Sequence, residues 1–339
     1  MSAPLLQVEG LTVSVNVKGR WLVVLDGVTF DVPAAGSVGL VGESGSGKSM
    51  TLRAIIGLLP SNGRVEAGSI TFDGTDLVAN PRTMASVRGS GITMVFQEPA
   101  VALNPIMKVG EQITDAVRRH ENLNQRQARQ LAVELMDRVG ITDPANRVDS
   151  YPFELSGGMR QRVMIASAIA AKPRLILCDE PTTALDVTVQ AQVMALFAEL
   201  RDQLGAALLY VTHDLPVVAS LCRDAAVLYG GRIMETGPIE DVFTRPRHPY
   251  TQALLASTPS IDGPTQRLAA IPGTAPGLAD RPSGCPFAPR CGLAQPDCSE
   301  SMPAFTGPLR GGLACHHPLV PGTLGAPGVP NPADQGVTV

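Results

Sequence analysis

At positions 42–49 the chain reads Gly42-Glu43-Ser44-Gly45-Ser46-Gly47-Lys48-Ser49. This stretch fits the pattern G-x-x-x-x-G-K-S/T, and it stands between the apolar run Val38 to Val41 and the helical pattern Leu52 to Leu59. Glycines allow backbone N–H groups to curl around a phosphate at the start of a helix. Lys48 would supply positive charge to the β- and γ-phosphates, and Ser49 would offer its hydroxyl to Mg²⁺. The order of strand, loop and helix favours a phosphate-binding loop over an ordinary glycine-rich turn.

Two adjacent carboxylates follow a buried-strand pattern later in the chain. The run Arg174 to Cys178 is apolar after its first residue, and Asp179 and Glu180 come at its end. In a chain that also has a phosphate-binding loop, such a position brings an aspartate beside the phosphates, where it organises Mg²⁺. We therefore expect Asp179 to bind the metal ion. Glu180 is predicted to polarise the attacking water as general base.

The pattern around these motifs predicts an α/β fold. The first forty residues contain short strands rich in Val and Leu, and Phe72 to Gly74 marks a turn between two more, which predicts a small antiparallel layer near the N-terminus. Strand patterns then alternate with helical patterns, which favours a mainly parallel sheet covered by helices. These strands are expected to end at Val41, near Val95, at Cys178 and at Val211.

The chain divides into three predicted parts. Between Gln97 and Tyr151 it becomes polar and helical, with apolar residues at three- and four-residue steps, which predicts an inserted helical subdomain at about residues 98–160. Those apolar residues are Ala128, Leu131, Leu135 and Val139. The predicted parts are a nucleotide-binding domain of residues 1–245, a C-terminal extension of residues 246–318, and a tail of residues 319–339 whose composition predicts disorder.

Composition restricts the class of protein. The chain has 339 residues, of which 44% are hydrophobic and 17% charged, which is typical of a soluble globular protein with a large core. Its net charge of -4 disfavours nucleic acid as a partner. Apolar runs stay well short of the roughly 18 to 20 residues that a membrane-spanning helix needs. The N-terminus lacks the pattern of a secretory signal, so we expect a cytosolic location.

A third motif resembles a known family. The stretch Leu155-Ser156-Gly157-Gly158-Met159-Arg160-Gln161 is similar to the signature motif of ABC ATPases, which other families with this phosphate-binding loop lack. A serine hydroxyl and glycine amides at the start of a helix form a second anion site. The resemblance implies that this site serves ATP bound by a different protomer. The residues implied in that contact are Ser156, Gly157, Gly158 and Gln161.

Three further positions are assigned by the same resemblance. Gln97 resembles the glutamine that touches Mg²⁺ and the attacking water while sensing the transmembrane partner. Asp186 resembles a residue of the loop that passes between protomers, near the opposite phosphate-binding loop. His213 resembles the switch histidine that contacts the γ-phosphate and steadies Glu180. Each alone has a structural explanation, but their ordered succession in one chain favours the functional one.

The residue that stacks on adenine is left open. Family members usually carry an aromatic residue in the early strand region, where this chain has Val15. Trp21 could take the role from the neighbouring turn, and a half-buried strand tryptophan is the alternative.

Other stretches resemble the ATP-binding subunits of oligopeptide, dipeptide and nickel importers. They are Phe96-Gln97-Glu98-Pro99, Leu103-Asn104-Pro105, Gly110-Glu111-Gln112-Ile113 and Arg247-His248-Pro249-Tyr250-Thr251. The resemblance implies ATP-driven closure of two ATPase subunits, the second one non-identical, that moves two membrane permease subunits fed by an external substrate-binding protein. It also implies a peripheral location on the cytoplasmic face of the inner membrane. The cargo is left open between peptides, nickel, glutathione and other small solutes.

Four cysteines occur in the Pro-rich extension, at Cys285, Cys291, Cys298 and Cys315. Because a cytosolic disulfide is disfavoured, we expect a metal ion or an iron–sulfur cluster to hold this segment together. The spacing lacks the Cys-x2-Cys pairs typical of structural zinc, and related importer subunits resemble this tail where four cysteines hold a 4Fe–4S cluster. We prefer the cluster, with zinc as the alternative because His316 and His317 follow.

Two other functions fit part of the pattern. One is a soluble ABC ATPase that acts as a clamp on ribosomes or DNA, but such proteins usually have two cassettes or a long coiled-coil insertion. The other is a module that binds ATP without hydrolysing it, which the presence of both Glu180 and His213 opposes.

Overall fold

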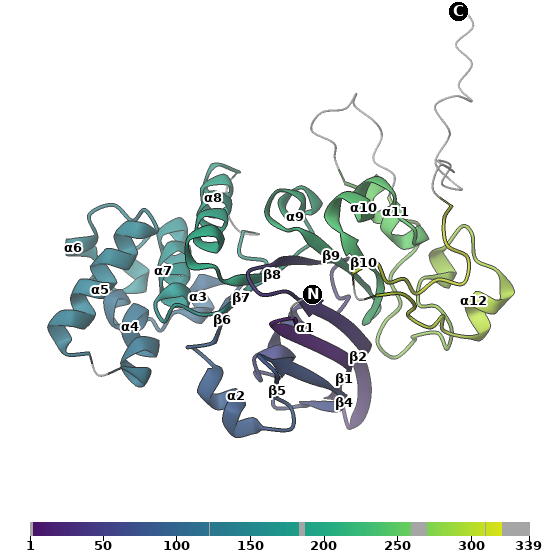
Figure 1. The fold of residues 1–339 in the computed structure, drawn as a ribbon, viewed down its shortest axis with the longest axis horizontal. Coiled ribbons are helices and arrows are strands. Elements are labelled where there is room, and N and C mark those ends of the chain that lie inside the picture. Colours follow the sequence, from purple (N-terminus) through teal and green to yellow (C-terminus); the bar gives the residue numbers. More distant parts are fainter. Residues whose placement is uncertain (1–2, 122, 183–186, 259–269, 309, 321–339) are drawn as a thin grey trace, which may run out of the picture.

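The computed structural model describes residues 3–121, 123–182, 187–258, 270–308 and 310–320. Figure 1 shows a central sheet, with a second sheet beside it, the helical subdomain at one end and the C-terminal extension at the other. Within the described residues, no helix has both the length and the apolar character needed to cross a membrane.

The central sheet has six strands in the order β10-β9-β3-β8-β7-β6. Its strands are β3 (Ser37–Val41), β6 (Ile92–Val95), β7 (Leu175–Asp179), β8 (Ala207–Thr212), β9 (Asp224–Tyr229) and β10 (Arg232–Pro238). All neighbours pair in parallel except β9 and β10, which are antiparallel. The parallel strands are buried along their whole length because both sheet faces are covered, which explains their nearly continuous apolar sequences.

The second sheet is antiparallel, with the order β2-β1-β4-β5. It consists of β1 (Leu6–Val17), β2 (Arg20–Val32), β4 (Gly63–Phe72) and β5 (Thr75–Asp76). The expected turn after Phe72 is a two-residue hairpin loop, in which Asp73 (φ 50°) and Gly74 (φ 79°) both have left-handed backbones. The predicted α/β class, with a mainly parallel sheet and an N-terminal antiparallel layer, is confirmed.

Side chains of the central sheet alternate between two apolar clusters. Leu175 and Leu177 face the antiparallel sheet and α1 (Lys48–Ile55), whereas Ile176 and Cys178 face the other side. That other side is covered by α7 (Gly157–Ile169), α8 (Val187–Leu204) and α9 (Leu215–Leu221). The sheet is therefore held between two layers, and the loops that follow β3, β7 and β8 meet at one edge of it.

The helical subdomain contains several short elements and two longer helices. They are α3 (Pro99–Ala102), α4 (Val109–His120), α5 (Gln125–Arg138), α6 (Pro144–Arg147) and the 3₁₀ turn Pro152–Glu154, while α2 (Pro81–Val87) precedes β6. Of the predicted apolar stripe, Ala128, Leu135 and Val139 are buried and Leu131 is partly buried. Helix α7 continues beyond residue 160 into the central core, so the signature stretch joins the subdomain to the sheet.

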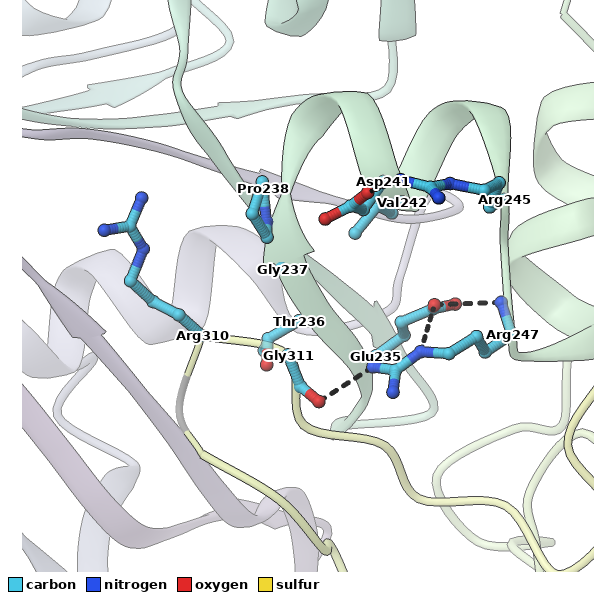
Figure 2. A pocket seen from close by; sticks show the side chains of 10 residues that line it. All are labelled: Glu235, Thr236, Gly237, Pro238, Asp241, Val242, Arg245, Arg247, Arg310 and Gly311. Carbon is cyan, nitrogen blue, oxygen red and sulfur yellow. Dashed lines mark hydrogen bonds and ion pairs between the residues drawn. The ribbon is translucent and has the colours of Figure 1, made fainter. Parts of the chain in front are cut away.

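The C-terminal extension packs on the central sheet. Its helices are α11 (Pro249–Ala256), the 3₁₀ turn Ala288–Arg290 and α12 (Pro296–Glu300), and α10 (Ile239–Thr244) precedes them. Ala314 donates its N–H to the Met234 carbonyl of β10 (2.9 Å), so the returning chain runs along this edge strand. A cavity of about 500 Å³ lies between β10, α10 and Gly311. Beside it, the buried Glu235 side chain accepts a hydrogen bond from the backbone N–H of Arg247 (Figure 2).

Candidate active site

The loop of residues 42–49, called the phosphate loop below, connects β3 to α1 as the sequence predicts. Gly42, Gly45 and Gly47 all have positive φ angles, of 155°, 78° and 109°. A Cβ atom on Gly42 would overlap the carbonyl oxygen of Leu228, and one on Gly47 would press against the Leu25 side chain. A side chain at Gly42 would therefore displace the backbone of β9, and one at Gly47 would displace the Leu25 side chain and strain the loop backbone.

Lys48 is buried inside this loop. Its Nζ donates to the carbonyl oxygens of Gly42 (2.8 Å) and Glu43 (2.9 Å) and lies 4.0 Å from a carboxylate oxygen of Glu180. Burial lowers the pKa of Lys48, against the opposing effect of Glu180 and Asp179. A partly desolvated ammonium at the start of a helix is well placed to receive phosphate oxygens.

Ser49 and Asp179 are brought together from positions 130 residues apart. The Ser49 hydroxyl donates to Asp179 Oδ1 at 2.7 Å. Burial is the main factor that raises the pKa of Asp179, and the bond from Ser49 partly offsets it. A buried carboxylate next to a hydroxyl provides two oxygen ligands of the type that Mg²⁺ prefers, so these residues fit the metal ion that the sequence predicts.

Glu180 follows Asp179, and its side chain lies next to His213. Its backbone has a left-handed φ of 43°, held by the N–H bond to the Val211 carbonyl (2.9 Å). Its carboxylate lies 3.2 Å from His213 Nδ1. A left-handed backbone is costly for a residue other than glycine, and such strain is often found in functional sites. The arrangement gives a carboxylate held by a histidine, beside the lysine that would bind phosphate.

The signature stretch forms the N-terminus of α7. Ser156 caps this helix by accepting the Met159 N–H at 3.3 Å, and its side chain is exposed. Among the described residues, a Cβ on Gly157 would have no atom within 4 Å, and one on Gly158 would contact Val189 alone. The helix end is therefore open on its outer side, as a surface for binding phosphate on another chain would be.

The remaining sequence-predicted residues have different surroundings. Gln97 is exposed and lines a cavity of about 90 Å³ with Gly157 and Gln161, next to the signature stretch. Gln161 is only 1% exposed, so it would have to turn outwards to reach a nucleotide on another chain. Asp186 lies outside the described residues.

The two candidates for adenine stacking also differ. Val15 is buried, while Trp21 is 43% exposed with the Arg64 guanidinium 3.9 Å above its ring centre. Adenine would have to use the opposite ring face or displace Arg64.

Two residues at the phosphate loop could not be identified from the sequence alone. Tyr250 and Arg290, both in the C-terminal extension, contact Glu43. Tyr250 belongs to a stretch that resembles importer subunits and Arg290 precedes Cys291, but neither position has a spacing that relates it to residue 43.

Comparison with known proteins places these features in a family. A family model described as ABC transporter matches residues 25–183. A second model, described as the C-terminal region of oligopeptide/dipeptide transporters, matches residues 234–298. The chain belongs to the ABC transporter ATPases of the oligopeptide/dipeptide type. As an ABC ATPase, it hydrolyses ATP to ADP and phosphate.

Similar proteins agree with this assignment. The dipeptide transport ATP-binding protein DppD of Escherichia coli strain K12 is 44% identical over 317 residues, which cover 93% of this chain and 97% of that protein. A Brucella abortus protein named for ATP binding in peptide import is 46% identical over 319 residues, covering 94% of this chain and 95% of that protein.

Solved structures support the same fold. The dimeric post-hydrolysis state of an ATP-binding cassette with bound ADP and phosphate matches this ABC ATPase with a TM-score of 0.63 and 25% identity, over 69% of this chain and 98% of the other. The cassette cbiO1 of Clostridium perfringens matches with a TM-score of 0.61 and 25% identity, over 72% and 92%. The match of the extension to a transporter region disfavours the alternative of a clamp on ribosomes or DNA.

Proposed function

We propose that this chain is one motor subunit of a peptide importer, in which ATP binding and hydrolysis drive partner membrane permeases. The observation that carries the proposal is the transporter-type extension, joined to a cassette whose phosphate loop, Asp179 and Glu180 meet at one edge of the sheet. Peptides are the proposed cargo because relatives of nearly the same length are named for peptide or dipeptide transport.

The proposed chemistry assigns one role to each residue at this edge. Lys48 and the phosphate-loop amides bind the β- and γ-phosphates, and Ser49 with Asp179 holds Mg²⁺, which neutralises phosphate charge when bound. Glu180 accepts a proton from the attacking water, and His213 keeps its carboxylate in position. Catalysis then depends mainly on positioning and charge neutralisation.

The open N-terminus of α7 supports a head-to-tail pair of ATPase subunits. We propose that Ser156, Gly157 and Gly158 bind the γ-phosphate of ATP on a partner subunit, with Gln161 and Asp186 in the same interface and Gln97 at Mg²⁺. A non-identical sister subunit is the proposed partner.

The surface beside Gln97 supports contact with a permease. A groove of about 310 Å³ between α1, β6 and the helical subdomain is lined by Leu58, Met94 and Phe96. We propose that a cytoplasmic helix of the permease lies here, which would place the subunit on the cytoplasmic face of the inner membrane. An external binding protein would deliver the cargo.

The four cysteines of the extension support a bound iron–sulfur cluster. Cys285, Cys291, Cys298 and Cys315 line one small apolar cavity, although they span 31 residues of sequence. Burial raises the pKa of Cys285 and Cys291, and that of Cys315 to about 11. These three thiols are therefore neutral at pH 7 when no metal is bound, and a metal would displace their protons.

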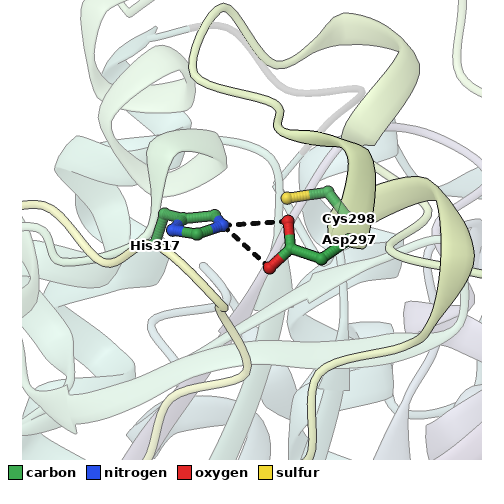
Figure 3. A group of neighbouring side chains, drawn as sticks. All are labelled: Asp297, Cys298 and His317. Atoms are coloured by element: carbon green, nitrogen blue, oxygen red, sulfur yellow. Dashed lines mark hydrogen bonds and ion pairs between the residues drawn. The ribbon is translucent and has the colours of Figure 1, made fainter.

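The positions of the ligand atoms bear on the alternative of a zinc ion. Four sulfurs around one zinc ion would lie about 3.8 Å apart, from the usual Zn–S distance and tetrahedral geometry. Within the described residues, the group whose ligand atoms all lie within 4.8 Å of one another is Asp297, Cys298 and His317, with one cysteine (Figure 3). Within the described residues no group that close contains the four cysteines, and His317 is engaged with Asp297 at 2.9 Å, so the side chains do not form a four-sulfur zinc site as they stand. The preference for a cluster rests on the cysteine spacing in the sequence.

The cluster proposal is tested by anaerobic purification of the full chain. A brown protein with broad visible absorption is expected, and Cys291→Ser should lose the colour whereas Cys222→Ala, a core cysteine away from the cavity, should keep it. A colourless protein with one zinc per chain would exclude the cluster.

The motor proposal is tested in a complex reconstituted with its permeases and sister subunit. Glu180→Gln should lower ATP hydrolysis by about 100-fold or more, the usual contribution of a general base, while ATP binding is retained. Peptide uptake into vesicles should fall in parallel. Unchanged hydrolysis in Glu180→Gln, or hydrolysis that never responds to the permeases, would contradict the proposal.

A further inference from the structure

Glu43 connects the phosphate loop to the C-terminal extension through its N–H and its carboxylate. Its N–H donates to the Tyr250 hydroxyl at 2.9 Å, and its carbonyl oxygen accepts from Lys48 Nζ at 2.9 Å. Its carboxylate receives both terminal nitrogens of Arg290, at 2.6 and 3.1 Å. One residue of the loop thus touches the phosphate-binding lysine on one side and two extension residues on the other.

Arg290 is held in place for this contact. Its side chain is only 6% exposed, and it also donates to the Tyr229 hydroxyl (3.1 Å) and to the carbonyls of Pro272 (2.8 Å) and Ile271 (3.3 Å). A guanidinium with this many acceptors has one preferred orientation. Arg290 is 247 residues from Glu43 in sequence and adjoins Cys291, so the cysteine-lined region and the phosphate loop share a boundary.

An aromatic cluster packs beside the contact between Arg290 and the phosphate loop. Phe287 packs on Tyr229 of β9 and on Tyr250 of α11, with ring centres 5.3 and 5.2 Å apart, and the two tyrosine rings are 4.5 Å apart. Tyr250 is fully buried. Its hydroxyl therefore cannot move away from the Glu43 N–H unless the extension shifts as a whole.

The charge of Glu43 gives this contact a consequence for ATP. A carboxylate inside a loop that binds several phosphate charges repels them unless a cation neutralises it. Arg290 forms a two-point ion pair with that carboxylate and so neutralises its charge. Without Arg290, Glu43 would be a partly exposed anion beside the phosphates and an alternative partner for the lysine.

We propose that Arg290 and Tyr250 are positioning residues of the nucleotide site, through which the C-terminal extension sets the ATP affinity of this subunit. The proposal rests on the phosphate-binding role of the loop at residues 42–49. It makes the extension a part of the ATP site in the same chain. Damage to the fold around Cys291 is therefore expected to weaken ATP binding through the displacement of Arg290.

The test measures binding of a fluorescent non-hydrolysable ATP analogue, with Mg²⁺, to the purified full chain. Arg290→Gln should raise the dissociation constant about tenfold, the scale of one hydrogen-bonded charge left unpaired. The double variant Glu43→Gln, Arg290→Gln should restore most of the affinity because it removes the unpaired carboxylate. In the reconstituted complex, Arg290→Gln should raise KM for ATP far more than it lowers kcat, and Arg290→Lys should be intermediate.

Arg310→Gln is the matched control. Arg310 is also an extension arginine paired with a carboxylate of the central sheet, Asp224 at 2.6 Å, but this pair does not involve the phosphate loop. It should bind the analogue as the unmodified chain does. Wild-type affinity in Arg290→Gln, equal losses in Arg290→Gln and Arg310→Gln, or a double variant as weak as the single one would overturn the proposal.

A second control separates this inference from the assignment of the loop. If Lys48→Ala binds the analogue normally, the phosphate loop itself is wrongly assigned. If Lys48→Ala loses binding while Arg290→Gln keeps it, only the role of the extension is overturned. The thermal unfolding midpoint of each variant shows whether a loss of binding is caused by unfolding of the protein.

Discussion

The phosphate loop and the N-terminus of α7 are built from the same residue types, Ser and Gly at a helix start, but they differ in how the chain surrounds them. The first is enclosed, since Leu228, Leu25 and Tyr250 pack against it and Lys48 is buried within it. The second is open, because a Cβ added at Gly157 would meet no atom of the described residues within 4 Å and Ser156 is exposed. We therefore expect the enclosed site to bind ATP in the single chain, and the open one to act only on ATP bound by another chain.

The largest effect is expected from Gly42→Ala, which breaks the enclosed site. The added Cβ would overlap the Leu228 carbonyl, and the backbone φ of 155° disfavours a side chain. Strain of about 1–3 kcal/mol together with displaced loop amides should weaken ATP binding by the isolated subunit by about 100-fold. Calorimetric titration with an ATP analogue measures this, and unchanged affinity would show that the loop is less confined than its contacts indicate.

A smaller and different effect is expected from Gly157→Ala. Because an added Cβ would have no described atom within 4 Å, the isolated subunit should fold and bind ATP normally. In the assembled complex the extra methyl group would lie against the partner's nucleotide and should lower hydrolysis about tenfold by misplacing the γ-phosphate. The two alanine variants therefore separate a site closed by its own chain from one closed by a partner. Equal loss in subunit and complex would refute that distinction.

The smallest effect concerns the helix cap. Ser156→Ala removes the hydroxyl that accepts the Met159 N–H and should cost about 1 kcal/mol of stability. Asn124→Ala removes a similar cap, at the start of α5, that is remote from the signature stretch. Both should lower the denaturant midpoint by similar amounts, but only Ser156→Ala should also lower hydrolysis in the complex. A matching loss of activity in Asn124→Ala would assign the effect to helix stability alone.

Much of this site was predictable because local chemistry dictates it. A tight turn between a strand and a helix requires glycine, so the sequence of residues 42–49 specifies its own backbone. The carboxylates Asp179 and Glu180 follow a continuous apolar run, and such runs form parallel strands whose ends meet at one edge. The helical stripe from Ala128 to Val139 was likewise recognised from its period, although the helix itself ends at Arg138.

Other features were beyond sequence reasoning. The signature resemblance assigns Gln161 to the interface, and the structure shows that this residue of α7 has a buried side chain, because successive residues of a helix point in different directions. The sequence alone could not decide whether Trp21 stacks on adenine or is an ordinary strand residue. The structure shows that its ring is partly exposed and that the Arg64 guanidinium lies over it. Burial on a given face depends on neighbouring elements that no local pattern specifies.

By itself, the sequence determined the order of strands and helices, the phosphate loop and the carboxylates that follow β7, since each depends on residues close together in the chain. The motifs also predicted that Ser49 and Asp179 share a site, and the structure places them in contact across 130 residues. Only the tertiary structure decided that Glu43 meets Arg290 across 247 residues. The reason is that contacts between elements follow from how whole layers pack, and in that packing the C-terminal extension covers one side of the ATP site.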